Sequence, residues 1–155
     1  MKKGVLAFLS LVVGAVVGVA FKTFFKKENK KEDGKVYKFK LYYNVLNQWL
    51  ANKQEGKFLS EYFENNGYKN IAIYGMGELG CRLYEELKNS DIKVCYGLDK
   101  ETGSPYSDLE VYSIEDEFEP VDAIVVSAVF AFDKIKGDLE KKVDCPIISL
   151  EDVIY

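Results

Sequence analysis

The sequence has no histidine at all, and its 155 residues include only three cysteines and three prolines. Histidine is the side chain best suited to accept a proton near neutral pH and is the commonest metal ligand. Its absence excludes serine–histidine hydrolases and histidine-ligated zinc sites. Cys81, Cys95 and Cys145 are odd in number and scattered along the chain. They cannot form a disulfide framework, and free thiols are typical of a reducing compartment.

Acidic residues are scarce near the N-terminus and abundant elsewhere. Residues 1–40 contain ten lysines and three acidic residues, a net charge of +7, which leaves −11 for the other 115 residues of a chain whose total is −4. Nucleic-acid binding needs a clustered basic face that neutralises phosphates. We therefore expect no nucleic-acid partner.

The basic N-terminal segment surrounds a long run without charge. Residues Gly4 to Phe21 would form a helix about 27 Å long, close to the ~30 Å hydrocarbon core of a bilayer. Lys2 and Lys3 precede this run and eight lysines follow it by residue 40, so the positive-inside rule places the C-terminal side in the cytoplasm. The sequence predicts a single-pass transmembrane anchor over residues 1–21 and a basic tether over residues 22–36.

Two further interpretations concern the same segment. A cleavable signal peptide is an alternative to the anchor, because Gly18-Val19-Ala20 offers small residues at a cleavage point. If the segment is an anchor, Gly14 and Gly18 lie one helical turn apart, where two such helices could approach closely and form a homodimer.

Residues 37–67 have the pattern of two amphipathic helices that extend the domain. The first carries the apolar pairs Leu41/Tyr42, Val45/Leu46 and Trp49/Leu50, and the second carries Phe58/Leu59 and Tyr62/Phe63 before Asn66-Gly67, a helix-ending signal.

Residues 68–155 alternate strand and helix patterns, which predicts an α/β fold: a Rossmann-like parallel sheet of about five strands with flanking helices. Expected strands cover residues 71–74, 92–98, 109–112, 123–126 and 145–149. Expected helices carry Leu79, Leu83 and Leu87, then Ile135, Leu139 and Val143. Ser113 and Ser149 each follow a strand and precede acidic residues, as N-cap residues do.

A glycine-rich motif directly after the first strand carries the functional signal. In a GxGxxG loop, the first glycine permits a tight turn, the second lets the backbone approach a pyrophosphate, and the third lets the helix pack close to the strand. The helix N-terminus adds N–H groups and the positive end of its dipole. We expect phosphate contacts from Gly75, Met76, Gly77, Glu78, Leu79 and Gly80.

Three residues complete the predicted site. Asp99 ends the second strand, 24 residues after Gly75, where a carboxylate would hold a ribose 2′-hydroxyl. Lys100 could offset the 2′-phosphate of NADP, so NAD and NADP both remain open as cofactors. Ser127 ends the strand after which the chain crosses the topological switch point, so it could line the crevice. Cys81, in the first turn of the glycine-loop helix, is interpreted as a packing residue rather than a reactive thiol.

Through Gly75, Gly77, Gly80 and Asp99, residues 68–155 resemble the NAD(P)-binding Rossmann superfamily. They are also similar to the small Rossmann-like domains attached to bacterial surface-polysaccharide enzymes, such as the nucleotide-sugar-binding domain of sugar acetyltransferases. The resemblance implies NAD, NADP or a nucleotide sugar as ligand and a role in cell-envelope polysaccharide synthesis. The acetyltransferases' glycine loop usually carries a histidine, which is absent here, and their β-helical catalytic domain has no counterpart.

Three functions are compatible with these patterns. The leading one is a membrane-anchored, noncatalytic nucleotide-binding module that acts on a partner enzyme, because the sequence shows no proton relay. The second is an oxidoreductase or nucleotide-sugar-modifying enzyme completed by dimerisation or by a partner subunit. The third is an interaction scaffold whose crevice stays empty.

Overall fold

A computed structural model describes residues 34–100 and 108–155. The chain divides into two units, Met1–Tyr42 and Tyr43–Tyr155. Within the described ranges, no helix is both long and apolar enough to cross a membrane. The predicted transmembrane anchor over residues 1–21, with Gly14 and Gly18, lies outside the described residues.

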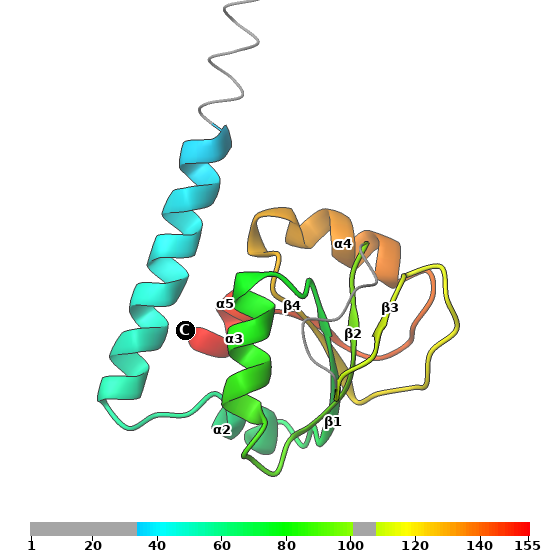
Figure 1. The fold of residues 1–155 in the computed structure, drawn as a ribbon, viewed down its shortest axis with the longest axis horizontal. Helices are drawn as coiled ribbons and strands as arrows, with labels where there is room; N and C mark the ends of the chain where they lie inside the picture. Colours follow the sequence, from blue (N-terminus) through cyan, green and yellow to red (C-terminus); the bar gives the residue numbers. More distant parts are fainter. Residues whose placement is uncertain (1–33, 101–107) are drawn as a thin grey trace, which may run out of the picture. The chain divides into compact units, whose positions relative to one another are not determined.

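The second unit contains a parallel sheet of five strands, which confirms the expected α/β fold (Figure 1). The spatial order is β3-β2-β1-β4-β5, so the order reverses between the neighbouring strands β1 and β4. All four strand pairs are parallel. The strands are β1 (Asn70–Tyr74), β2 (Lys93–Leu98), β3 (Val111–Tyr112), β4 (Ala123–Val126) and β5 (Ile147–Ser149).

Helices cover both faces of the sheet. The helices of this part are α2 (Ser60–Asn65), α3 (Glu78–Leu87), the 3₁₀ turn η1 (Val129–Ala131), α4 (Phe132–Leu139) and α5 (Leu150–Ile154). The crossover through α3 leads from β1 to β2, and the one through α4 leads from β4 to β5, in the opposite direction along the sheet. Right-handed crossovers in opposite directions place their helices on opposite faces, as α3 and α4 are in Figure 1.

Successive side chains of each strand point to opposite faces of the sheet, and the core is built from both faces. Side chains at alternate positions of β1, β2 and β4 form one buried cluster with Leu139 of α4. The intervening residues Ile71 and Ile73 are also fully buried and point to the other face. That face is covered by α3, whose Leu79, Leu83 and Leu87 are buried. These three leucines are those that the sequence placed on one face of this helix.

The first helical segment begins earlier than expected. Residues 34–54 are helical, so residues 34–36 belong to this helix rather than to the solvated tether predicted over 22–36. Lysine has a high helix propensity and keeps its charge in water, so a charged sequence does not prevent helix formation. The helix ends at Gly56, whose φ of +75° is the left-handed conformation that favours glycine at a helix end. Gly67, with φ +75°, ends α2 in the same way, as expected.

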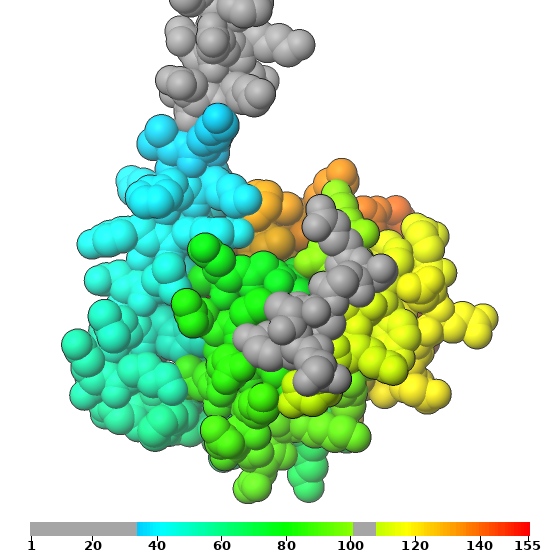
Figure 2. Space-filling model, in the orientation of Figure 1, coloured from blue at the N-terminus to red at the C-terminus, as the bar shows by residue number. Residues whose placement is uncertain are grey.

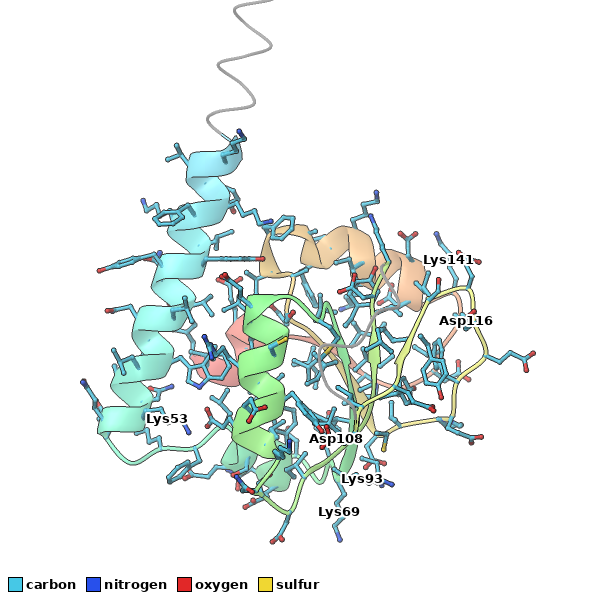
Figure 3. The ribbon with its side chains drawn as sticks, viewed as in Figure 1. Lys53, Lys69, Lys93, Asp108, Asp116 and Lys141 are labelled. Atoms are coloured by element: carbon cyan, nitrogen blue, oxygen red, sulfur yellow. The ribbon has the colours of Figure 1, made fainter. Side chains whose placement is uncertain are left out.

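The segment after β3 forms a turn and not the helix expected from Ser113. The Ser113 hydroxyl accepts a hydrogen bond from Glu115 N–H at 3.3 Å, and Asp116 accepts one from Ser113 N–H at 2.8 Å. The Lys142 ammonium donates to the carbonyls of Ile114 and Asp116, both at 2.6 Å. These carbonyls are therefore occupied where a continuing helix would need them. Figure 3 labels Asp116 in this segment.

A buried carboxylate joins three helices of the second unit. The side chain of Glu86, on α3, is only 6 % exposed. It accepts hydrogen bonds from the indole of Trp49 at 2.6 Å and from the backbone N–H of Leu59 at 2.9 Å. Lys53, labelled in Figure 3, forms an ion pair with it at 3.0 Å. Glu86 therefore holds the end of helix 34–54 and the start of α2 against α3.

Replacing Glu86 with alanine is expected to lower the free energy of unfolding by about 3 kcal/mol, because it leaves two buried N–H donors unpaired. Urea unfolding followed by tryptophan fluorescence measures this directly, since Trp49 is the only tryptophan. Glu85→Ala is the matched control: Glu85 is the exposed neighbour on the same helix, so its loss should change stability by less than about 0.5 kcal/mol. Equal effects of the two variants would contradict the role of Glu86.

A second carboxylate, that of Asp122, connects β1 with β4 at the amino ends of these strands. Its carboxylate accepts hydrogen bonds from the backbone N–H groups of Lys69 at 2.8 Å and Asn70 at 2.7 Å. These hydrogen bonds hold the pKa of Asp122 below its ordinary value, because they stabilise the ionised form. The start of β1 is thereby tied to the residue just before β4.

The lowered pKa predicts a pH dependence of stability. A depressed folded-state pKa contributes stability above the unfolded-state value of about 3.9, and this contribution is lost as the pH falls through the folded-state pKa. Urea unfolding of the wild type and of Asp122→Asn should be measured at pH 6 and at pH 2.5. Between these two pH values the wild type should lose more unfolding free energy than the variant. If both proteins lost stability equally, Asp122 would not be coupled to folding in this way.

Candidate functional site

The candidate site lies at the carboxyl ends of β1 and β4, where the strand order reverses. In open α/β sheets this reversal opens a crevice, because the chain leaves the two strands in opposite directions. Gly75 follows β1 and Ser127 follows β4. The Ser127 hydroxyl donates to the carbonyl of Gly75 at 2.5 Å, and the Ser127 N–H donates to that of Tyr74 at 2.9 Å. The structure thus brings together the glycine loop and Ser127, which are far apart in sequence.

The three glycines of the loop have different surroundings. Gly75 has a φ of +93°, a conformation that L residues rarely adopt. A Cβ on Gly80 would lie 2.0 Å from the carbonyl oxygen of Gly75, so α3 packs against the turn at a distance that only glycine allows. A Cβ on Gly77 would meet no atom of the described residues within 4 Å. Gly77 is therefore the position of the three that is open to solvent or to a ligand.

The N-terminus of α3 faces this open position. Gly77 is the N-cap residue and has no side chain to cap the helix. The first N–H groups of an α-helix lack partners within the helix and carry the positive end of its dipole. An anionic group beside Gly77 would meet these donors, and Gly77 lets it approach the backbone closely.

Asp99 is placed at the loop, but it already has structural partners. Its carboxylate accepts hydrogen bonds from the backbone N–H groups of Met76 at 2.7 Å and Lys100 at 2.6 Å. The first of these bonds joins the end of β2 to the glycine loop across 23 residues of sequence. Asp99 therefore shapes the loop in addition to lying where a ribose was expected.

The remaining predicted residues divide into buried and exposed positions. The side chains of Met76 and Leu79 are buried, so contacts from these residues to a ligand would come from the backbone. Glu78 and Lys100 are exposed, and Glu78 lies in the first turn of α3. Its negative charge there is favourable for the helix dipole but unfavourable for a neighbouring phosphate.

Two further residues make close contacts in the loop region: Cys81, interpreted above as a packing residue, and Gly97, which the sequence reasoning did not consider. The Cys81 thiol donates to the carbonyl of Met76 at 3.3 Å, as suits a packing residue. Gly97 was given no role, yet a Cβ there would lie 2.8 Å from the Met76 side chain. A glycine inside a strand often marks such a close approach, and this signal was present in the sequence.

The sequence also contains two Tyr-x-x-x-Lys spacings that the sequence reasoning missed, Tyr84/Lys88 and Tyr96/Lys100. Tyr96 is buried in β2, and its hydroxyl donates to the carbonyl of Glu119 at 2.7 Å. Tyr84 and Lys88 have the spacing of the catalytic pair of short-chain dehydrogenases, but they lie in the last turn and at the C-cap of α3, about 10 Å and about 16 Å from Gly77 along the helix axis. Lys88 forms an ion pair with Asp108 at 3.3 Å. Burial, followed by a hydrogen bond with Asp108, raises the pKa of Tyr84 above its ordinary value. The pair is therefore structural with respect to this site.

A pocket of about 670 Å³ lies at the amino ends of β4 and β5, opposite the carboxyl ends that form the candidate site. It is lined by Tyr96 of β2 and by residues that precede β4 and β5, with Phe118 and Cys145 among them. Burial raises the pKa of the Cys145 thiol, which disfavours the reactive thiolate. In the described ranges, no three histidine, cysteine or acidic side chains are grouped so that they could hold a metal ion.

Comparison of the chain with protein-family models, with curated proteins and with solved structures finds no match. Any functional assignment therefore depends on the residues and their geometry.

The surroundings of the glycines predict that two similar substitutions change the unfolding free energy by very different amounts. Gly80→Ala places a methyl group against the Gly75 carbonyl and should cost about 3 kcal/mol or more of unfolding free energy. Gly77→Ala meets open space at an extended N-cap residue and should change it by less than about 1 kcal/mol. Urea unfolding of both variants tests the difference. A Gly77→Ala variant as unstable as Gly80→Ala would show that the open position is misassigned.

Proposed function

We propose that residues 68–155 form a Rossmann-like domain that binds the pyrophosphate of a nucleotide at the loop from Gly75 to Gly80. The observation that carries the proposal is the open position at Gly77, between two glycines whose side-chain space is already filled. It faces the N-terminus of α3 at the point where the strand order reverses. The backbone there fits a pyrophosphate, because a Cβ on Gly77 would occupy the path along which such a group approaches.

The rest of the site supports a nucleotide with a ribose. Asp99 lies at the end of β2 beside the loop and is the candidate for the ribose hydroxyls. Lys100, which is exposed, is the candidate for the 2′-phosphate of NADP. Ser127 would line the crevice from the side of β4. The ligands we propose are NAD, NADP or a nucleotide sugar.

The domain is proposed to act by binding rather than by catalysis. The chain has no histidine, and Tyr84 and Lys88 are held away from the loop. Tyr96, which has the same spacing to Lys100, is buried and donates its hydroxyl to the carbonyl of Glu119. A binding module of this kind would act on a partner enzyme. Its place in cell-envelope polysaccharide synthesis rests on the resemblance alone.

We further propose that residues 1–21 anchor the protein in a membrane, with the nucleotide-binding domain on the cytoplasmic side. The support is the charge-free run from Gly4 to Phe21 and the eight lysines between residues 22 and 40. Those lysines would attract anionic lipid headgroups at about 1 kcal/mol for each lysine near the surface.

One observation favours a second function, an interaction scaffold without ligand. The hydrogen bond between Asp99 and the Met76 N–H stabilises the loop in the absence of any nucleotide. A loop held in this way keeps its shape whether or not a phosphate is present. The two functions differ in a measurable property, which is ligand-dependent stability.

Thermal unfolding of the full chain in detergent, with and without millimolar NAD, NADP or a uridine diphosphate sugar, distinguishes them. A ligand present at 100 times its Kd adds about 2.7 kcal/mol, which corresponds to an increase in Tm of roughly 5–10 °C for a protein of this size. The increase should disappear in Gly77→Ala and persist in Gly137→Ala, a matched control because a Cβ on Gly137 also meets no atom within 4 Å in the part of the chain that the structure describes. No increase with any of these ligands would favour the scaffold.

A further inference from the structure

The side chain of Tyr74 carries a hydroxyl group that the described part of the fold does not use. Tyr74 is the last residue of β1 and comes directly before Gly75. It is only 8 % exposed, and its ring belongs to the buried cluster on the face of the sheet that α4 covers. Among the described residues, every fully buried side-chain nitrogen or oxygen atom has a hydrogen-bond partner. The Tyr74 oxygen has no such partner there, so it reaches the surface.

The pairing of the strands places Tyr74 in the middle of the edge that carries the candidate site. It pairs with the last residues of β2 and of β4, which Asp99 and Ser127 follow directly. A ligand held at Asp99 by its ribose and at Gly77 by its pyrophosphate would continue past the end of β1 toward β4. This path leads from the side of α3 to the side of α4, where Tyr74 lies. Figure 2 shows atoms of α3, in green, and of the segment around α4, in orange, at the surface of the second unit in one view.

The charges around Tyr74 indicate which part of a nucleotide would meet it. Burial, followed by the carboxylates of Asp99 and Asp138, raises the pKa of Tyr74 above its ordinary value, so the phenol is protonated at neutral pH and can donate. The same carboxylates would repel a phosphate beside it, Asp99 more than Asp138, because Asp138 pairs with Lys141 at 3.1 Å. Sugar hydroxyls are uncharged and both donate and accept, so they suit a phenol with carboxylates nearby.

We propose that the Tyr74 hydroxyl donates a hydrogen bond to the sugar attached to the second phosphate of the bound nucleotide. The inference rests on the nucleotide site proposed above and narrows the class of its ligand. NAD, NADP and nucleotide sugars carry such a second sugar, whereas ADP and UDP end at the phosphate. A ligand without this sugar gains nothing from Tyr74, which makes Tyr74 a specificity-determining residue.

Truncating the ligand and the side chain together tests the proposal. The full chain in detergent is titrated with NAD, NADP and uridine diphosphate glucose, and with the forms that lack the second sugar: ADP, 2′-phospho-ADP and UDP. The dependence of Tm on ligand concentration gives each apparent Kd. Tyr74→Phe should weaken the binding of a sugar-bearing ligand about fivefold, as expected for one neutral hydrogen bond, and that of its truncated form by less than about twofold. The ligand-free Tm should not change, because no hydrogen bond of the fold is lost.

Tyr96→Phe is the matched control. Tyr96 is also buried and belongs to the same cluster, but its hydroxyl donates to the carbonyl of Glu119 at 2.7 Å. This variant should lower the ligand-free Tm and leave every Kd unchanged, the opposite of Tyr74→Phe. If Tyr74→Phe weakened a ligand and its truncated form equally, or weakened neither, the inference would be wrong and the nucleotide site would stand. If no ligand raised the Tm of the wild type, both would be wrong.

Discussion

The contact between Gly80 and the carbonyl of Gly75 positions the main parts of the second unit. A Cβ on Gly80 would lie 2.0 Å from that oxygen, so α3 leaves the sheet directly beside the turn that ends β1. The positive φ of Gly75 makes this turn possible, and Ser127 donates to the same carbonyl from the end of β4. One carbonyl group thus joins β1, α3 and β4. The site exists because the strand order reverses where this carbonyl is held.

The electrostatics of the site follow from the same geometry. Residues 41–155 carry a net charge of −11, and Glu78 and Asp99 lie at the loop itself. Recognition of a phosphate there would depend on backbone N–H groups and the helix dipole, whose strength falls off within the first turn. Such recognition requires close approach, and so the absence of a side chain at Gly77 matters more than the presence of any cation.

Local patterns allowed most of the sheet and the loop to be predicted from the sequence, whereas contacts between distant segments were not predictable. The strand over residues 123–126 and the leucine face of α3 were predicted because burial imposes periods of two and 3.6 on the residues themselves. The role of Glu86 was missed because its partners Trp49 and Leu59 are 37 and 27 residues away and a carboxylate in a helix usually faces water. The helix expected after Ser113 is absent for the same reason: Lys142, which binds its carbonyls, is 28 residues from Ile114.

The C-terminal part of helix 34–54 connects these observations, because its buried face packs on the domain that carries the candidate site. Trp49 and Lys53 meet at Glu86, so the end of the helix is fixed to α3, the helix whose N-terminus forms the candidate site. Since Glu86 and Gly80 lie on the same ten-residue helix, a displacement at one end would reach the glycine loop through rigid structure. Glu86 is therefore one physical link between helix 34–54 and the candidate site, beside the hydrogen bond from the Asn52 side chain to the carbonyl of Ile154 on α5.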